Sequence, residues 1–359
     1  MIIHFVGGFL GSGKTTAITN AAKQLLKENI ITGVVTNDQG KYLVDSKFIS
    51  MSEIANVEVT GGCFCCNYDE LDKQINVLKN KINPAIIFAE SVGSCTDLIA
   101  TVVKPMNQYS KNDIVTFSGF VDSQLLLRYL KGDELPFSVE TNYIWEKQIE
   151  EAEILVINKF DLLDSTEINE LVDLANLHFA LKTLLFQNSL DEKSVQLWVE
   201  TINKFNPEGN RKAIEVDYKI YGAGEANLAW LDEGIKIKSI TKSAVESAFA
   251  FIDDVTETIA NLKLPIGHLK FFLTTREESA KISITTVMGN SWKSAVKLNE
   301  SYDVQLMINA RIQSSPAKVR SIISDAVKRL KINDNIQIEE NDINYFQPGF
   351  PNPTHRLVG

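Results

Sequence analysis

The first fifteen residues constrain the fold of this chain more than any other stretch. Residues 2–6 form a short apolar run typical of a buried strand, and residues 8–15 follow with the pattern G-x-x-x-x-G-K-T. From residue 16 to residue 28, apolar side chains recur at helical spacing. Strand, glycine-rich loop and helix in this order are the context in which the pattern binds nucleotide phosphates. The alternative is an ordinary glycine-rich turn before a helix.

The chemistry of a phosphate loop predicts what each of its residues does. Glycines let backbone N–H groups close around phosphate oxygens, and the start of the helix adds unpaired N–H donors with partial positive charge. We expect Lys14 to reach the β- and γ-phosphates and the hydroxyl of Thr15 to bind Mg²⁺. The predicted phosphate-binding residues are Gly8, Gly11, Ser12, Gly13, Lys14, Thr15 and Thr16.

Composition narrows the classes of partner. The chain has 359 residues and a net charge of −10, which argues against nucleic acid and against an anionic membrane surface. We see no apolar run near the roughly 20 residues that a membrane helix needs, and no basic segment typical of a signal peptide. Three of the four cysteines fall within four positions, unlike a secreted disulfide framework. We therefore expect a cytoplasmic protein.

Apolar strand-like runs alternate with helical patterns in the first half of the chain. The predicted strands cover residues 2–6, 30–36, 57–60, 85–89, 114–121 and 154–157. Helical periodicity covers residues 69–81 and 167–185. This alternation predicts an α/β fold, a P-loop NTPase domain with a mostly parallel sheet covered by helices on both faces. Ligands bind beyond the carboxyl ends of such strands, so motifs that follow the strands should meet at one edge.

The pattern changes near residues 206–210, which read as a linker. The predicted domains are therefore 1–207, the nucleotide-binding domain, and 208–359, a smaller α+β domain. Strands are predicted at residues 229–238, 264–275, 281–287, 303–312 and 336–338, with helices at 242–262 and 316–330. This order favours a ferredoxin-like sheet with an additional strand.

A second nucleotide motif follows the strand at residues 154–157. Residues 158–161 read Asn-Lys-x-Asp, the signature of guanine recognition. The carboxylate of Asp161 can accept hydrogen bonds from N1–H and the exocyclic amine of guanine, a donor pair that adenine lacks. The Lys159 stem would pack on the base beside Asn158. The pattern predicts GTP as the nucleotide, and the alternative is a simple turn at the end of a strand.

Two acidic residues occupy the positions expected of Mg²⁺ and hydrolysis machinery. Glu90 follows the strand that should carry the acidic residue, and it can hold Mg²⁺ directly or through water, or position the attacking water. Gly93 would offer its N–H to the γ-phosphate. Asp38, where a first switch loop would lie, can bind Mg²⁺ or a second metal, although its neighbours also suit an ordinary turn. The predicted catalytic residues are Lys14, Asp38 and Glu90.

The least ordinary stretch is Cys63-Phe64-Cys65-Cys66, preceded by two glycines. Side chains alternate along an extended strand, so three thiols point together only if the backbone curls, which the glycines permit. Three thiolates form a soft site for Zn²⁺, Co²⁺ or Cu(I), with Zn²⁺ the default. A fourth position would be open or filled by water, Cys95, a histidine or a residue of a partner. The alternatives are buried small hydrophobes or a redox thiol cluster.

Taken together, residues 8–16, 61–66, 90–93 and 158–161 resemble those of the CobW-type metallochaperone GTPases, relatives of the nickel-insertion GTPases of urease and hydrogenase. The resemblance covers about the first 200 residues and implies GTP-dependent delivery of a metal, often Zn²⁺, or service to a cobalt or corrinoid enzyme. The usual Asn-Glu-x-Gly motif is here Asn-Asp-Gln-Gly at residues 37–40, and a histidine-rich stretch is absent.

The predicted partners are GTP, a client metalloenzyme or corrinoid protein, and a second copy of the chain in a homodimer. No arginine lies near the phosphate motifs in sequence, and Arg128 is the nearest candidate. We therefore expect slow GTP hydrolysis that a partner or dimerisation accelerates. Two other functions fit the motifs, a P-loop kinase or ATPase with structural cysteines and a nucleotide-gated scaffold that binds no exchangeable metal. The tail around His355 has the composition of a segment that lies over a neighbouring surface.

Overall fold

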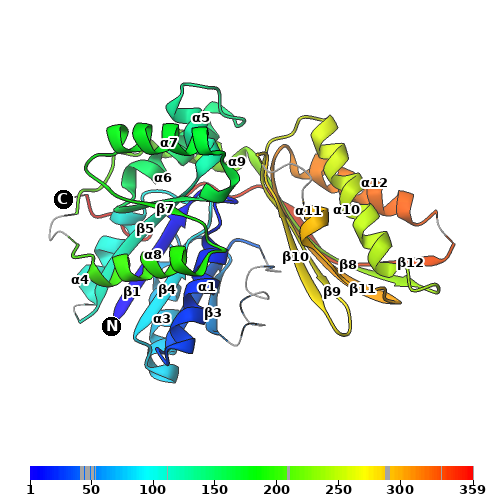
Figure 1. Ribbon diagram of the computed structural model, residues 1–359, viewed down its shortest axis with the longest axis horizontal. Helices are drawn as coiled ribbons and strands as arrows, with labels where there is room; N and C mark the ends of the chain where they lie inside the picture. Colours follow the sequence, from blue (N-terminus) through cyan, green and yellow to red (C-terminus); the bar gives the residue numbers. More distant parts are fainter. Residues whose placement is uncertain are drawn as a thin grey trace. The chain divides into compact units, whose positions relative to one another are not determined.

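The computed structural model describes residues 1–40, 44, 49, 52, 54–110, 112–207, 211–287, 292–332 and 334–358. The chain forms two compact units (Figure 1). The first contains Met1–Gln39, Asp45–Gly224 and Phe350–Gly359, and the second contains Gly40–Val44 and Glu225–Gly349. The sequence pattern predicts a boundary after residue 207. The compact units of the structure separate after Gly224, and residues from Phe350 onward belong to the first unit. Of the predicted linker, residues 208–210 lie outside the described part.

The first unit is built on a seven-stranded parallel sheet in the order β3-β2-β4-β1-β5-β6-β7. Its strands are β1 (Ile2–Gly8), β2 (Thr32–Asp38), β3 (Ala55–Thr60), β4 (Ile86–Glu90), β5 (Ile114–Asp122), β6 (Ile154–Asn158) and β7 (Thr183–Gln187). The central strands are continuous apolar runs because helices cover both of their faces. This arrangement confirms the predicted α/β class.

Helices lie between these strands and after the last of them. They are α1 (Lys14–Lys27), α3 (Tyr68–Ile82), α4 (Lys104–Tyr109), α5 (Ser123–Leu130), α6 (Val139–Glu151), α7 (Ser165–His178), α8 (Glu192–Lys204) and α9 (Tyr218–Ala226), with a π-helical turn η1 (Ile99–Val103) and a 3₁₀ turn η2 (Phe160–Leu162). Helices α1 and α8 pack on one sheet face around the buried indole of Trp198. In the described ranges, no helix combines the length and apolarity that a bilayer crossing requires.

The predicted helix over residues 167–185 is wrong in its second half. Helix α7 starts at a capping box formed by Asp164 and Glu167 and ends at His178. Residues Thr183–Gln187 instead form β7, the edge strand that pairs with β6 in parallel. A short apolar run fits the period of a helix and that of a strand equally well. Here the pairing with β6 determines that the run is a strand.

The second unit is a five-stranded antiparallel sheet in the order β10-β9-β11-β8-β12. Its elements are β8 (Leu228–Ser239), α10 (Ala244–Asn261), β9 (Ile266–Thr274), β10 (Ser279–Ile284), α11 (Trp292–Ala295), β11 (Asp303–Gln313), α12 (Pro316–Leu330) and β12 (Ile336–Phe346). Helices α10 and α12 bury their apolar faces in the same core as the strands. Without β10 the order and crossovers are ferredoxin-like, so the predicted sheet with one additional strand is confirmed.

Candidate nucleotide and metal site

Each strand of the parallel sheet delivers a polar or thiol-bearing segment to the same edge. Strand β1 runs into the glycine loop, β3 is followed by the cysteines, and β7 is followed by a serine. Strands β2, β4, β5 and β6 end directly in polar residues, namely Asp38, Glu90, Asp122 and Asn158. All seven strands are parallel, so these segments lie along one edge of the sheet, where ligands bind in doubly wound folds.

The glycine loop folds around its own lysine. The Nζ of Lys14 donates hydrogen bonds to the carbonyl oxygens of Gly8 at 2.6 Å and Phe9 at 3.1 Å, and the side chain is only 6% exposed. Gly13 has a φ of 92°, and a Cβ there would collide with the amide nitrogen of Asn158. The buried hydroxyl oxygen of Ser12 has no hydrogen-bond partner among the described residues. A buried cation beside an unsatisfied hydroxyl fits a phosphate group.

The strand-end acid touches the helix that begins this loop. The hydroxyl of Thr15 donates a 2.8 Å hydrogen bond to Oε1 of Glu90, and both side chains are buried. Three residues later, Gly93 approaches the loop so closely that a Cβ would lie 2.9 Å from the backbone nitrogen of Leu10. An alcohol and a carboxylate in contact are the oxygen donors that Mg²⁺ takes from proteins in phosphate sites.

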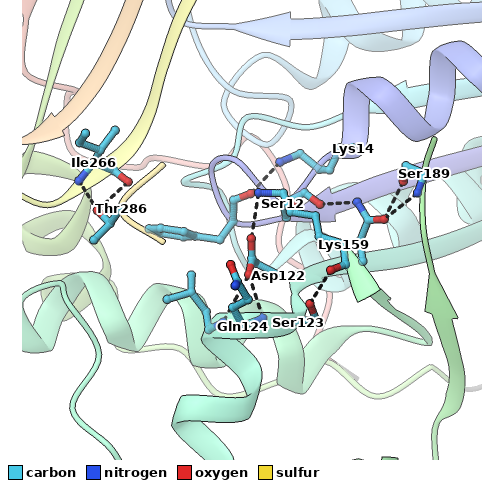
Figure 2. A network of polar contacts seen from close by, with 12 residues as sticks. Ser12, Lys14, Asp122, Ser123, Gln124, Lys159, Ser189, Ile266 and Thr286 are labelled. Atoms are coloured by element: carbon cyan, nitrogen blue, oxygen red, sulfur yellow. Dashed lines mark hydrogen bonds and ion pairs between the residues drawn. The ribbon is translucent and has the colours of Figure 1, made fainter. Parts of the chain in front are cut away.

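The Asn-Lys-x-Asp segment is fixed from two sides. The amide nitrogen of Asn158 donates to the carbonyl of Ser12 at 2.7 Å, and its Oδ1 accepts from the hydroxyl of Ser189, also at 2.7 Å. Lys159 adopts a left-handed φ of 61° and its Nζ pairs with Oδ2 of Asp122 at 2.8 Å (Figure 2). Asp161 is exposed in η2. The motif therefore contacts the glycine loop directly and leaves the carboxylate of Asp161 accessible.

Sequence reasoning missed two residues of this network, Asp122 and Ser189. Asp122 caps α5 through Oδ1 and holds Lys159 through Oδ2. Its position at the end of a predicted strand was visible in the sequence, but nothing there indicated its lysine partner. Ser189 follows β7, the strand that was predicted as helix, so its place at the sheet edge was hidden.

The three clustered cysteines converge as predicted. The Sγ atoms of Cys63 and Cys65 are 2.9 Å apart, those of Cys63 and Cys66 3.2 Å, and those of Cys65 and Cys66 3.8 Å. A tetrahedral zinc site with Zn–S bonds of about 2.3 Å needs sulfurs about 3.8 Å apart. Small side-chain rotations at Cys63 would therefore open the triangle to metal-binding size. All three are free thiols, and Cys66 is the one that is not buried.

Hydrogen bonds among the thiols lower the pKa of one cysteine and raise those of the other two. Thiol hydrogen bonds from Cys65, Cys66 and Cys95 lower the pKa of Cys63 well below its ordinary value. The hydrogen bond with Cys63 is the largest of the causes that raise the pKa of Cys65 well above its ordinary value and that of Cys66 to about 11. One thiolate supported by neighbouring S–H groups is a soft anionic donor set suited to a thiophilic metal ion.

Asn37 holds the thiol turn, residues 61–66, against β2. Its amide nitrogen donates to the carbonyls of Val59 at 3.0 Å and Gly62 at 2.7 Å, and its Oδ1 accepts from the backbone N–H of Phe64 at 2.8 Å. Asn37 is buried and directly precedes Asp38. The residue before the predicted switch acid is therefore part of the scaffold of the thiol turn.

Cys95 connects the thiols to the loop that begins at Glu90. Its side chain is fully buried and lies near enough to Cys63 and Cys65 to lower the pKa of the first and raise that of the second. Gln148 fixes the backbone here by donating to the carbonyls of Gly93 at 3.0 Å and Cys95 at 2.8 Å. Three of the sulfurs, those of Cys63, Cys65 and Cys66, lie within 4.8 Å of one another.

The group of ligand atoms formed by the three thiols includes no histidine of the described residues. His4 is buried in β1, where its Nδ1 is 2.6 Å from the Thr116 hydroxyl, and burial followed by the charge of Arg211 lowers its pKa to about 3. His268 is buried in β9, and His178 lies on α7 with Nδ1 at 2.9 Å from the carbonyl of Leu174. The ring of His355 meets that of Tyr68 edge-on, with centroids 4.9 Å apart.

A parallel sheet with a glycine-lysine-threonine loop, a strand-end acid and an Asn-Lys-x-Asp segment at one edge defines a P-loop nucleotide-binding protein. The profile of the CobW/HypB/UreG nucleotide-binding domain matches residues 2–179. The urease accessory protein UreG of Staphylococcus aureus is 31% identical over 170 residues, which are 44% of this chain and 71% of UreG. The chain belongs to the CobW/HypB/UreG family of P-loop GTPases.

Two further comparisons describe its relatives. The zinc chaperone CobW of a Sinorhizobium species is 27% identical over 191 residues, which are 47% of this chain and 53% of that protein. The chain thus spans about half the length of this curated relative. Among solved structures, HypB from Helicobacter pylori in complex with nickel aligns with a TM-score of 0.42 at 14% identity, over 58% of this chain and 91% of that one.

Proposed function

We propose that this protein is a nucleotide-gated metallochaperone. It binds GTP with Mg²⁺, hydrolyses GTP slowly, carries Zn²⁺ or Co²⁺ on Cys63, Cys65 and Cys66, and delivers it to a client metalloenzyme or corrinoid protein. The family and the relative named zinc chaperone support metal delivery, and the use of free, clustered thiols supports the cytoplasm as the compartment.

The observation that carries this proposal is the path of a single segment, residues 90–95. At its start Glu90 accepts a hydrogen bond from Thr15, and at its middle Gly93 packs on Leu10 of the phosphate loop. At its end the thiol of Cys95 affects the pKa of both Cys63 and Cys65. A rearrangement that the γ-phosphate imposes on the first half of this segment reaches the sulfurs within six residues.

The residues divide the work as follows. Lys14 and the N–H groups around Gly13 would hold the phosphates, Thr15 and Glu90 would hold Mg²⁺, and Asp161 would select guanine. Asp38 is the second acid at this edge and belongs with the hydrolysis machinery or with a second metal position. The switching of a site from 99:1 loaded to 1:99 loaded requires about 5.5 kcal/mol of differential affinity. Changes at Asp38, which follows the Asn37 that holds the thiol turn, and at Cys95 supply two routes to this difference in affinity.

The deciding experiment measures bound metal and its affinity with and without nucleotide. Wild type should bind one Zn²⁺ or Co²⁺ per chain, and addition of GTP with Mg²⁺ should change the affinity at least tenfold. Cys65→Ser should lose the metal while it keeps GTP binding. Lys14→Ala should bind metal as wild type does, but GTP should no longer alter the affinity.

Two results would replace this proposal. If wild type holds no exchangeable metal under conditions in which GTP binds, the protein is a nucleotide-gated scaffold or a hydrolase with structural cysteines. If metal binds but its affinity is identical with and without GTP, the thiols and the nucleotide are independent and gating is wrong. The GTP affinity and melting temperature of Cys65→Ser serve as the control for intact folding.

A further inference from the structure

The end of the chain lies on the thiol turn. The backbone N–H of Thr354 donates to the carbonyl of Cys65 at 2.8 Å, and its hydroxyl donates to the carbonyl of Cys66 at 3.1 Å. The N–H of Asn352 points at the Sγ of Cys66, 3.3 Å away. Residues 351–357, which we call the C-terminal strap, therefore contact the backbone of two of the candidate metal-binding cysteines and the sulfur of one.

An ion pair fastens the strap two residues after Thr354. Nε of Arg356 lies 2.6 Å from Oδ2 of Asp97, a carboxylate with no solvent exposure. The hydroxyl of Tyr218 donates to the same oxygen at 2.7 Å, and the Arg356 guanidinium lies 5.7 Å from the Tyr218 ring centroid. The N–H of Leu357 donates to the carbonyl of Ala100 at 2.9 Å. Removal of Arg356 would leave the buried carboxylate of Asp97 without its charged partner, which is costly.

The contact with Cys66 falls at the accessible corner of the thiol triangle. Cys63 and Cys65 are 3% and 2% exposed, whereas Cys66 is half-buried. An incoming ligand from an acceptor protein must therefore approach a bound metal from the Cys66 side. An N–H group that donates to a thiolate withdraws charge from it and fixes its direction, as outer hydrogen bonds do for metal ligands generally.

The fastening point also belongs to the segment that contacts the phosphate loop. Asp97 lies two residues after Cys95, in the stretch of chain that begins at Glu90, and adopts a left-handed φ of 65°. Its neighbour Thr96 is tied to Glu151 by a 3.1 Å hydrogen bond. Asp97 is only two residues from Cys95, so a shift of residues 90–95 would act along the chain on the residue that holds the strap.

We propose that the C-terminal strap is a working part of the metal site, in which Asn352 and Thr354 position the thiol turn and Arg356 holds the strap closed. The strap slows the exchange of metal at Cys66, and its release opens the site to an acceptor. This inference rests on the proposed function, because it assigns a role in metal holding to residues outside the thiol turn. Arg356 is a positioning residue, since it acts through Asp97 and the strap.

The test uses the full chain, a chain that ends at Pro351, and the variants Arg356→Ala and Arg356→Lys. Zn²⁺-loaded protein is mixed with a chromogenic chelator, and the release rate is followed. Ending the chain at Pro351 should raise the rate about tenfold to a hundredfold, the usual effect of lost outer hydrogen bonds. Arg356→Ala should approach that rate and Arg356→Lys should fall between it and wild type. The matched control is Arg276→Ala, an exposed arginine of the second unit that should release metal as wild type does.

A spectroscopic measurement separates a role at the metal from a general loosening of the fold. The Co²⁺-loaded chain that ends at Pro351 lacks the N–H of Asn352 that donates to Cys66. Its thiolate-to-cobalt charge-transfer band should be shifted from that of wild type, whereas its GTP affinity should be that of wild type. A synthetic peptide of residues 352–359 added to the shortened chain should slow release again.

The outcomes are distinguishable from failure of the proposed function. If wild type binds no metal, metal delivery is wrong and the strap has no site to serve. If wild type binds metal but Arg356→Ala and the shortened chain release it at the wild-type rate with an unchanged cobalt spectrum, the strap proposal is overturned while metal delivery stands. If the shortened chain does not fold, the rates and spectra of Arg356→Ala against Arg356→Lys decide.

Discussion

The side-chain oxygen of Asn37 accepts a 2.8 Å hydrogen bond from the backbone N–H of Phe64, in the middle of the thiol turn. This contact joins the strand that ends in Asp38 to the loop that carries the cysteines. It gives the nucleotide edge a second connection to the metal site besides the 90–95 segment. The predictions below test the two connections and the chemistry at each end.

Removal of the Asn37 side chain should weaken metal binding. Asn37→Ala deletes one accepted and two donated hydrogen bonds that shape the turn, so we expect Zn²⁺ affinity to fall about tenfold to a hundredfold. Competition with a chelator of known affinity measures this fall. Asn76→Ala, which removes an exposed side chain on α3, is the matched control and should bind Zn²⁺ normally. Equal affinities in the two variants would show that the turn holds its shape without Asn37.

Glu90→Gln should impair Mg²⁺-dependent turnover more than nucleotide binding. The amide can still accept from Thr15, but it lacks the charge that draws a divalent cation. We expect the Mg²⁺ concentration for half-maximal GTP hydrolysis to rise at least tenfold and the maximal rate to drop by about a hundredfold or more. A Mg²⁺ titration of hydrolysis, with GDP binding measured in parallel, checks this. Unchanged Mg²⁺ dependence would assign the cation to other residues.

Asp161→Asn should relax the choice between GTP and ATP. Hydrogen bonds to charged groups contribute roughly 1.5–3 kcal/mol each, so loss of the carboxylate should weaken GTP about tenfold to a hundredfold. The affinity for ATP should not change, so the ratio of GTP affinity to ATP affinity should fall. Calorimetric titrations with both nucleotides measure the ratio, and Asp173→Asn, an exposed position on α7, is the control. A GTP preference that survives the substitution would move guanine recognition away from this motif.

The isolated protein should hydrolyse GTP slowly, on the order of 10⁻³ per second, as P-loop GTPases without a supplied arginine do. The nearest arginine in sequence, Arg128, lies on α5 and donates to the carbonyl of Glu134 at 2.9 Å. Turnover per chain should rise with protein concentration if a second copy supplies the missing charge. Single-turnover rates over a hundredfold range of concentration test this, and fast turnover at the lowest concentration would contradict it.

Glu151 should make the protein less stable as the pH rises. Burial, followed by the negative charge of Asp97, raises its pKa to about 8. The unfolded chain releases this proton near the ordinary glutamate pKa, so between about pH 4.5 and 8 the folded state holds one more proton. The stabilisation is complete below this window and is lost as the pH passes through it, at about 1.4 kcal/mol per pH unit at most.

Glu151→Gln removes that titration and keeps a neutral side chain of the same shape. Its free energy of unfolding should fall less steeply than that of wild type between pH 6 and pH 8, so that the difference between them shifts in favour of the variant by about 1 kcal/mol or more. Urea unfolding at three pH values measures this. Glu150→Gln, an exposed neighbour, should parallel wild type, and a Glu151→Gln curve parallel to wild type would mean that the carboxyl is already ionised at neutral pH.

The sequence was sufficient for the features that depend on local pattern. The glycine loop, the strand-end motifs and the α/β class follow from spacing, because each motif requires a strand before it and the parallel sheet aligns the strand ends. The convergence of the three thiols follows from the curl that Gly61 and Gly62 permit. The same reasoning fails for β7, a five-residue strand at the sheet edge whose three apolar residues are too few to show a period.

The contacts between residues far apart in the sequence could not be predicted from the sequence pattern. Nothing in the sequence pairs Asp122 with Lys159, or Asn37 with Phe64, because each pair depends on how loops from different strands pack at the sheet edge. The strap is the extreme case. Its composition predicted a segment that lies on a neighbouring surface, but its contacts with Cys65 and Cys66 join residues almost 290 positions apart.

Because residues from Phe350 onward complete the first unit, the polypeptide leaves that unit at Gly224 and returns after the whole second sheet. A gene fragment that stops at the boundary would yield a nucleotide-binding unit with its thiol turn uncovered. Exchange of the second unit between relatives would likewise succeed only if the replacement leads the chain back to the same place. Laboratory dissection of one unit from the other therefore has to supply residues 350–359 separately.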